Sequence, residues 1–247
     1  MRAQGLGSTS PRSSGAPMTK TSSAAALLVL ASGTACTTGN AGYERAATTA
    51  ERTETHREGL VKLRAQIGLT TDALRTLSEN PDVLPRSNRE TFETFARELR
   101  NLELQAERTR KSYGRMDAGA GRFFDGWVTD TAGITDADLR TRAEDRRAAL
   151  QASYVELAKD QRETDEALAG FVRRLDDLCI YLEHDLTTAG IASAREPIAR
   201  ALDEGSKIQQ RLGDLVHDAE VAGAGLEPLK AQAPSQNPRP NAGAQVR

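Results

Sequence analysis

Apolar residues recur every three or four positions between residues 44 and 222, a spacing typical of amphipathic helices. Segments rich in turn-forming residues interrupt the pattern at 80–87, 129–135 and 187–190 and divide it into four stretches. Within each stretch the alternation of three and four follows a heptad, which favours coiled-coil packing. We therefore predict an all-α fold: an elongated antiparallel three- and four-helix coiled-coil bundle with a long central hairpin.

The residues expected in the core are the heptad positions of each predicted helix. They are, in chain order, Leu60, Leu63, Ile67, Thr70, Leu74 and Leu77; then Phe92, Phe95, Leu99, Leu102, Ala106, Thr109, Tyr113, Met116, Ala120, Phe123 and Trp127; then Leu150, Tyr154, Leu157, Gln161, Thr164, Leu168, Phe171, Leu175, Leu178 and Leu182; and finally Ile198, Ala201, Gly205, Ile208, Leu212, Leu215 and Ala219. Antiparallel pairing predicts an apolar level containing Leu74, Phe171 and Ile208. At the level of Thr109 and Gln161 the core side chains are small or polar, so we expect this part of the bundle to pack thinly and to open more easily.

Three helix starts are predicted from capping patterns. Ser87 with Glu90 and Ser193 with Glu196 have the spacing of a capping box, and Thr135 has Asp138 three residues later. Short turns make consecutive helices antiparallel neighbours. The turn at 129–136 should therefore return beside the start of the first helix.

The first 35 residues have the pattern of a secretory signal. They contain three basic residues and no acidic one, and an apolar run of eight residues, Ala24–Ala31, follows Lys20. This run is too short for a membrane-spanning helix, which needs about 20 residues. We predict residues 1–35 to be a signal peptide, with Met18 as an alternative start.

Cys36 stands where a bacterial lipoprotein carries its lipid. Thr34 and Ala35 precede it as in a lipobox, although Gly33 replaces the usual aliphatic residue. The alternative is ordinary cleavage after Ala35, which leaves the cysteine unmodified. A lipidated Cys36 would attach residues 36–43 to the membrane as a linker. Thr37 is not the Asp typical of inner-membrane retention, which favours the outer membrane.

Charge and composition narrow the function classes. The 247 residues carry a net charge of −2, and removal of residues 1–35 leaves 30 basic and 35 acidic residues, a net charge of −5. A nucleic-acid-binding protein would show a basic excess, so no nucleic-acid partner is expected. Cys179 lies among leucines and is read as a small buried hydrophobe.

No pattern for catalysis, a metal or a cofactor stands out. The histidines are His56, His184 and His217, and Asp214-x-x-His217 alone has the spacing of a di-iron motif, which needs two such pairs. Nucleophile-elbow and phosphate-loop motifs are absent from the sequence. The aromatic residues Phe123, Phe124 and Trp127 could contact lipid or a partner, or cap the core of the bundle.

Two segments resemble a known family. Phe171–Leu186 followed by Ala189–Ser193, and the stretch from Phe123 to Trp127, are similar to bacterial domain-of-unknown-function family 2959, many of whose members are predicted lipoproteins. Leu182-x-His184-x-Leu186 is the most discriminating part. The resemblance covers most of 44–222 and implies a helical, exported protein. It supplies no activity and no catalytic residue.

We therefore expect a lipid-anchored protein of the bacterial cell envelope that faces the periplasm. It would be a non-enzymatic helical rod in a structural or protein-interaction role. Its partners would be the membrane, through the lipid on Cys36, and an envelope protein, and its free helix faces would allow homo-oligomers. The alternative is a soluble periplasmic binding or chaperone-like module. Residues 223–247 lack periodicity and are predicted to be a disordered tail.

Overall fold

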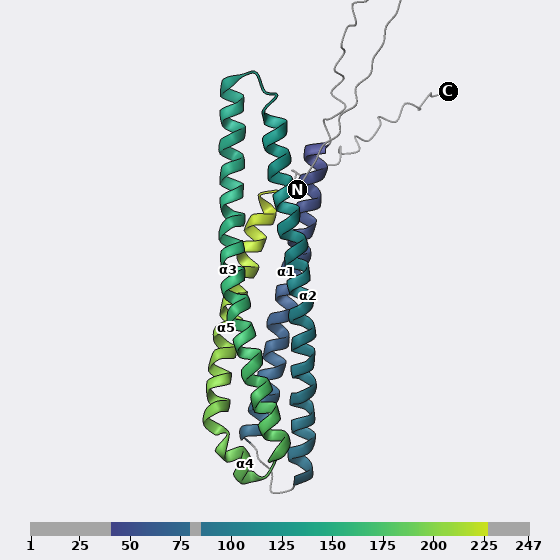
Figure 1. The fold of residues 1–247 in the computed structure, drawn as a ribbon, viewed down its shortest axis with the longest axis vertical. Helices are drawn as coiled ribbons and strands as arrows, with labels where there is room; N and C mark the ends of the chain where they lie inside the picture. The colour runs from purple at the N-terminus through teal and green to yellow at the C-terminus, as the bar shows by residue number, and fades with distance from the viewer. Residues whose placement is uncertain (1–40, 80–84, 227–247) are drawn as a thin grey trace, which may run out of the picture. The chain divides into compact units, whose positions relative to one another are not determined.

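The structure is a computed structural model that describes residues 41–79 and 85–226. It contains five helices: α1 (Ala41–Glu79), α2 (Pro85–Thr131), α3 (Ala137–His184), α4 (Thr188–Ser193) and α5 (Arg195–Ala224). They belong to one unit of the chain, and no strand occurs in the described ranges (Figure 1). The predicted all-α bundle is confirmed. No helix within these ranges is long and apolar enough to cross a membrane.

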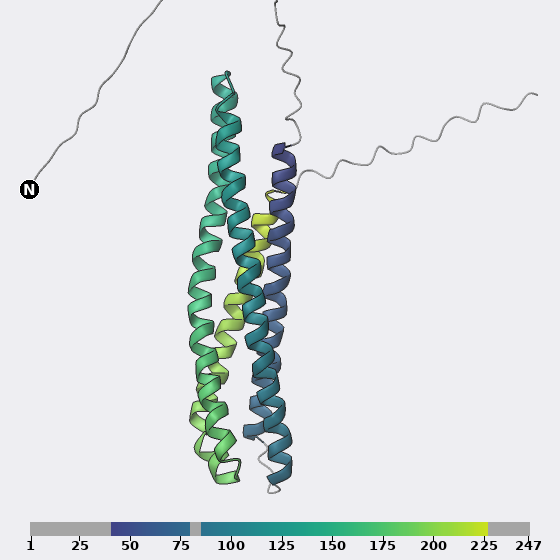
Figure 2. The ribbon, with the colours of Figure 1, turned by 45° about the vertical axis from the view of Figure 1, so that its right-hand side comes forward.

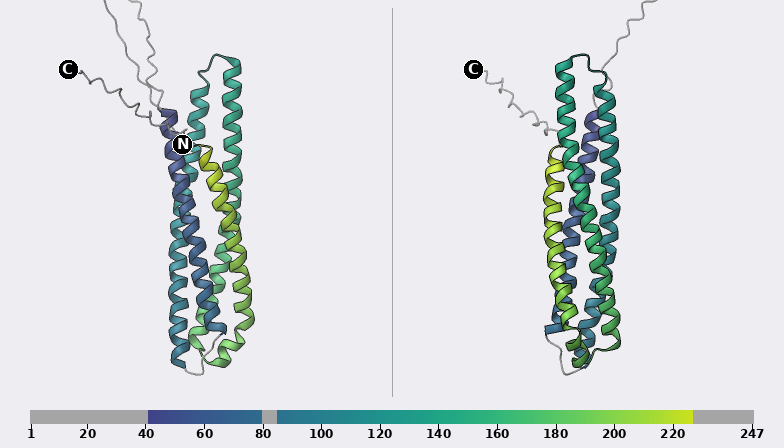
Figure 3. Two further views of the ribbon diagram at one scale, coloured as in Figure 1. Left: turned by 180° about the vertical axis from the view of Figure 1, so that it is seen from behind. Right: turned by 60° about the vertical axis from the view of Figure 1, so that its left-hand side comes forward.

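Four long helices run side by side. α1 packs against α2 and α5, and α3 packs against the same two helices (Figure 2). α2 and α3 have 47 and 48 residues, which corresponds to about 70 Å each, and form the central hairpin. Their connecting turn extends beyond the start of α1 and the end of α5 (Figure 3). The bundle is therefore four helices thick over most of its length and thinner at this end.

The core consists of the predicted heptad positions. Every position predicted for α1, α3 and α5 is buried. In α2, Phe92, Ala106, Tyr113 and Trp127 are only partly buried, and the other predicted positions are buried. Each fully buried leucine or phenylalanine contributes about 1.5–3 kcal/mol to folding.

α1 and α2 meet in a heptad register that uses small residues. A Cβ atom on Gly126 would lie 2.9 Å from Arg45 Nε, and one on Gly119 would lie 2.8 Å from Arg52 Nη1. Seven residues further along α1, a Cβ on Gly59 would lie 3.3 Å from Ser112 Oγ. At each of these levels a glycine on one helix makes room for a polar side chain of the other.

The predicted caps at Ser87 and Thr135 are wrong: a cap at Ser87 would start the helix three residues later than observed, and the cap of α3 is one residue after Thr135. α2 begins at Pro85, so Ser87 lies within the helix and its carbonyl accepts a hydrogen bond from Thr91 Oγ1 at 3.1 Å. Proline suits a first helical position because its missing amide hydrogen has no partner there. α3 is capped by Asp136, whose Oδ1 accepts from the Leu139 amide at 3.0 Å.

The capping box predicted at Ser193 and Glu196 is also wrong. Ser193 ends the short helix α4, and its hydroxyl donates to the Gly190 carbonyl at 2.7 Å. The residue that caps α5 is Ala194, which has no side-chain hydrogen bond to offer. Thr187 instead caps α4 and accepts from the Gly190 amide at 3.1 Å.

The ends of the bundle differ slightly from the expected limits. α1 begins at Ala41, within the range predicted as a linker. α5 continues to Ala224 and is followed by a turn at Gly225 and Leu226, where Leu226 is buried. The predicted signal peptide, Met18, Cys36 and residues 227–247 lie outside the described residues.

Candidate functional site

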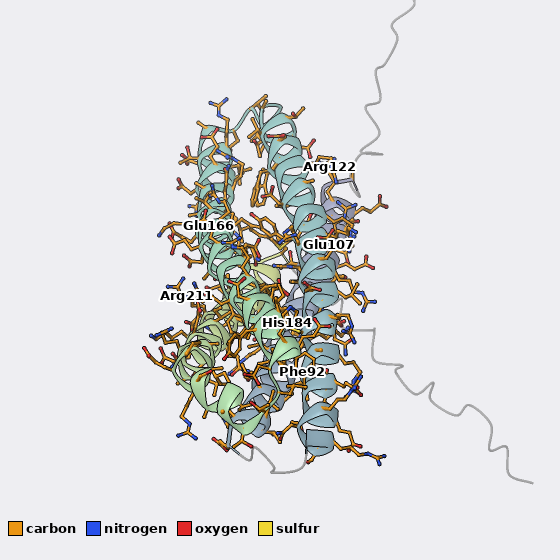
Figure 4. All side chains as sticks on the ribbon, turned by 60° about the horizontal axis from the view of Figure 1, so that its bottom comes forward. Phe92, Glu107, Arg122, Glu166, His184 and Arg211 are labelled. Carbon is orange, nitrogen blue, oxygen red and sulfur yellow. The ribbon has the colours of Figure 1, made fainter. Side chains whose placement is uncertain are left out.

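A layer of polar side chains crosses the core of the bundle. α1 supplies Thr53 and His56, α2 supplies Thr109 and Ser112, and α3 supplies Gln161 and Thr164; we call these six residues the polar layer. His56 and Thr53 are fully buried, and Ser112, the most exposed of the six, is 6% exposed. Charged side chains such as Glu107, Arg122 and Arg211 lie on the outside (Figure 4).

His56 links three helices. Its Nδ1 lies 3.1 Å from Ser112 Oγ on α2, and its Nε2 lies 3.1 Å from Gln161 Oε1 on α3. Gln161 Nε2 donates in turn to Asp165 Oδ1 at 3.1 Å. The ring of Tyr113 is tilted against the imidazole, with 5.6 Å between ring centroids.

These contacts define which nitrogen of His56 carries the proton. Because the Gln161 amide group donates to Asp165, its Oε1 faces His56 and accepts from Nε2–H. Nδ1 of the neutral ring is then an acceptor, and the single proton of the Ser112 hydroxyl can be donated either to Nδ1 or to the Thr109 carbonyl. Burial lowers the pKa of His56 to about 4, against the smaller opposing effect of the Gln161 hydrogen bond, so the ring is neutral at pH 7.

The layer also offers an arrangement for the protonated ring. The Thr109 carbonyl lies 2.7 Å from Ser112 Oγ. If Nδ1 gained a proton it would donate to Ser112 Oγ, and the Ser112 hydroxyl would turn to this carbonyl. Both states keep every hydrogen bond of the ring, so the cost of protonation is mainly that of burying a charge.

A second hydrogen bond ties α1 to α3. Thr53 Oγ1 donates to the Thr49 carbonyl at 2.9 Å, so it accepts from Tyr154 OH at 2.6 Å. Burial raises the pKa of Tyr154, against the weaker effect of Thr53. Across the described residues, every buried side-chain nitrogen or oxygen has a partner. The buried polar atoms of the polar layer are thus all hydrogen-bonded.

Sequence reasoning found Thr109, Gln161 and Thr164 but missed His56, Thr53 and Ser112. A signal was present, because Thr49, Thr53, His56 and Leu60 continue the alternation of four and three upstream of the predicted core. The apolar criterion overlooked these positions because their side chains are polar.

The order Ser112, His56, Gln161 resembles a nucleophile, a base and an orienting group. In acyl-transfer enzymes the nucleophile must reach a substrate. Here the three side chains are at most 6% exposed and face one another between helices, so a substrate would meet them only after helix separation. No group of three or more His, Cys, Asp or Glu in the described ranges could hold a metal ion.

The aromatic residues singled out from the sequence form a connected cluster. Phe123 and Phe124 are each 5% exposed, and ring centroids lie 5.4 Å apart between Phe123 and Trp127 and 5.6 Å apart between Phe124 and Tyr154, all in edge contacts. Trp127 is partly buried. It borders a pocket of about 360 Å³, which we call the end pocket; its lining residues are Gly42, Arg45, Ala46, Phe123, Trp127, Asp130, Thr131 and Ile134.

The segment that resembles the known family builds the turn between α3 and α4. Asp185 Oδ1 accepts from the amide and the hydroxyl of Thr187, at 3.1 and 2.6 Å. A Cβ atom on Gly190 would lie 2.3 Å from Asp185 Cγ, so only glycine fits there. Asn88 of α2 donates to the Leu186 carbonyl at 3.2 Å and fixes the turn to the hairpin.

Cys179 precedes this turn on α3. It is partly buried against the core and forms no disulfide in the described structure. Burial raises the pKa of its thiol, and the nearby carboxylate of Glu183 acts in the same direction. Both effects disfavour a reactive thiolate.

Comparison with known proteins identifies one family. No curated protein and no solved structure matches the chain. The model of one protein family, described as "Protein of unknown function (DUF2959)", matches residues 37–224, a range that begins directly after Cys36 and includes all five helices. The chain therefore belongs to the DUF2959 family.

Proposed function

We propose that this protein is a lipid-anchored component of the bacterial cell envelope, with a non-enzymatic helical bundle in a structural or protein-interaction role. The observation that carries the proposal is the position of Cys36, directly after an apolar run and small residues, five residues before α1 begins. An extended chain of five residues spans at most about 18 Å. A lipid on Cys36 would therefore hold the start of α1 close to the membrane surface.

The internal geometry of the bundle supports a defined orientation. Arg45, near the start of α1, pairs with Asp130 at the end of α2. The α2–α3 turn therefore lies at the end of the bundle that would be anchored. The α3–α4 turn with Asn88 lies at the other end of helices about 70 Å long, where an envelope partner would be met.

The chemistry of the core supports a role without catalysis. The one serine–histidine pair with catalytic geometry among the described residues is closed off between helices, and its hydrogen bonds connect α1, α2 and α3. Such a layer suits fixing helix alignment better than turning over a substrate.

Metabolic labelling with a fatty acid tests the anchor. We expect label on the wild-type protein, none on Cys36→Ala, and full label on Cys179→Ala, which removes the other cysteine. A wild-type protein without label would overturn the lipid anchor and favour the soluble periplasmic binding module. That module should bind an apolar dye when purified, because it would hold clients against exposed apolar surface.

Fractionation of the two membranes tests the location. We expect the wild-type protein in the outer membrane and Thr37→Asp in the inner membrane, since an acidic residue after the lipidated cysteine typically causes retention there. Thr38→Asp is the matched control and should leave the protein in the outer membrane. Wild-type protein in the inner-membrane fraction would contradict the expected location.

A further inference from the structure

The end pocket is walled by two helices and a turn. Its lining residues belong to α1, α2 and the turn after α2, and within the described structure neither α3 nor α5 contributes one. α5 runs antiparallel to α1, and a Cβ atom built on Gly223 would approach Thr53, so Leu226 lies near the level of residue 50. The pocket, at residues 42–46 of α1, is therefore beyond the level that α5 covers (Figure 3).

The wall of the pocket suits an apolar chain. It consists mainly of Ala46, Phe123, Trp127 and Ile134. Among the described lining residues the one hydroxyl is that of Thr131, and it donates to the Trp127 carbonyl of its own helix at 2.9 Å, so it is not offered to a ligand. The volume of about 360 Å³ is in the range of small-ligand pockets.

The charged residues of the end pocket lie at its mouth. Arg45 and Asp130 form an ion pair, and their side chains are 34% and 57% exposed. Asp130 accepts from Nη2 of Arg45, and no described residue accepts from Nε or Nη1. Because a guanidinium group has several N–H donors and binds phosphate side by side through two of them, Arg45 keeps donors for an anion at the mouth.

A second hollow adjoins the end pocket and shares Arg45 with it. This hollow, of about 410 Å³ between α1 and α2, contains Arg45, Arg52 and Arg122, and we call it the arginine groove. Arg45 lies over Gly126 and Arg52 lies over Gly119, so Arg122 is about halfway between them along the contact. Figure 4 shows Arg122 on α2 beside α1. Three guanidinium groups therefore line one groove.

The arginine groove has an excess of positive charge. Arg52 and Arg122 form no ion pair with a described residue, and Glu44 is the one acid among the described lining residues. A hollow lined by charges of one sign attracts ions of the other sign, and basic pockets between helices bind lipid head groups. The pocket and the groove together match a ligand that has an apolar chain and an anionic head.

We propose that the end pocket binds an acyl chain of an anionic phospholipid, whose phosphate lies at Arg45 and Arg122. A phospholipid carries the apolar chain and the anionic head in one molecule, and these are the two parts that the pocket and the groove accept. The bundle would thus hold a lipid without a covalent bond. This inference goes beyond the lipid anchor and does not depend on it.

Trp127 is the single tryptophan of the chain and therefore reports contact with the acyl chain. The probe is lysophosphatidylglycerol with a brominated myristoyl chain, used below its micelle concentration, because bromine quenches tryptophan on contact. All measurements use the full chain with Cys36→Ala, so that no covalent lipid can occupy the pocket. We expect saturable quenching. Lysophosphatidylcholine with the same chain should bind about tenfold more weakly, because its choline cation is repelled by the arginines.

Substitutions test the two parts of the site separately. Ala46→Leu fills the pocket and should abolish quenching, whereas Ala47→Leu, at the next residue of α1, lies outside the pocket and should keep it. Arg122→Gln should weaken binding about tenfold, because it removes charge-assisted hydrogen bonds to the phosphate. Arg108→Gln removes a charge from another exposed position of α2 and should leave binding unchanged. Circular dichroism shows that each variant keeps its helical fold.

Several outcomes would overturn the proposal. Absent or non-saturable quenching would show that no chain enters the pocket, and equal quenching in Ala46→Leu and Ala47→Leu would place the chain elsewhere. Unchanged affinity in Arg122→Gln would remove the head group from the groove. Emission that varies with protein concentration, and not with the lysolipid, would identify a second copy as the occupant. A failure of fatty-acid labelling at Cys36 would bear on the anchor alone.

Discussion

Two levels of the same core are built in opposite ways. Around Phe171 the core is apolar: the ring lies near Gly205 of α5, Thr71 of α1 approaches the same glycine, and the next core residues Leu74 and Ile208 are buried. The polar layer holds the same helices together through His56 instead. Apolar packing stabilises without regard to pH, whereas a buried imidazole stabilises only while it is neutral. The bundle thus has one pH-independent level and one level that responds to acid.

The largest expected effect is at the apolar level. Phe171→Ala should lower the free energy of unfolding by about 3–5 kcal/mol, because it removes a fully buried ring and leaves a cavity. Urea unfolding followed by circular dichroism measures it. Phe92→Ala, at a partly buried ring, is the control and should cost clearly less. Equal losses in the two variants would contradict the importance of this level.

The second-largest expected effect is a loss of folding stability at low pH, and it arises in the polar layer. The folded-state pKa of His56 is about 4, below its usual value of 6.5, so its contribution to stability is complete above pH 6.5 and is lost as the pH falls toward 4. The loss over this range should be about 3 kcal/mol. Unfolding curves at several pH values measure it.

Variants identify the source of this pH dependence. His56→Leu should remove most of the slope, while His184→Gln, at an exposed histidine, should keep it. Burial raises the pKa of Asp165, so acid relieves the cost of its buried charge and opposes the effect of His56. Asp165→Asn should therefore steepen the slope. A slope that survives His56→Leu would assign the acid response to other groups.

These two levels also show what could be predicted from the sequence. The buried positions of α3 were all predicted, and so were those of α5 except Ala222, because apolar side chains at heptad spacing mark most of them. The buried positions in the first half of α1 were not predicted, since polar residues, Thr49, Thr53 and His56, occupy them. The hydroxyl of Thr49 donates to the Arg45 carbonyl of the same helix, whereas Thr53 and His56 have hydrogen-bond partners distant in the sequence. The predicted helix starts differ because Pro85 occupies the first position of α2, Asp136 rather than Thr135 caps α3, and Thr187 caps the separate short helix α4.

A third prediction compares two glycines. Gly205→Ala should cost about 1–3 kcal/mol, because the new Cβ would lie 2.7 Å from Thr71 Cγ2 and 3.2 Å from Phe171 Cζ. Gly121→Ala meets no atom within 4 Å and should stabilise the exposed face of α2 by about 0.5–1 kcal/mol. Thermal unfolding of both variants gives the signs. A stabilising Gly205→Ala would show that the apolar core has unused space.

The smallest effect is expected from one hydrogen bond of the α1–α3 contact. Tyr154→Phe removes the hydroxyl that donates to Thr53 and keeps the ring against Phe124, so it should cost about 0.5–1.5 kcal/mol. The cost should not vary between pH 4 and pH 7. Tyr113→Phe is the comparison variant, because the ring of Tyr113 lies against His56, whose contribution to stability depends on pH.

The matching of glycines with polar side chains between α1 and α2 has a mechanical consequence. Arg45 and Arg52 each lie over a glycine of α2, seven residues apart on both helices. If α1 slid along α2, these arginines would leave their glycines and meet side chains that have a Cβ. The fit would return only after one full heptad, a displacement of about 10 Å. A pull on the start of α1 would therefore be resisted as shear across the whole α1–α2 contact, and the pair would hold its alignment until it gave way in a single step.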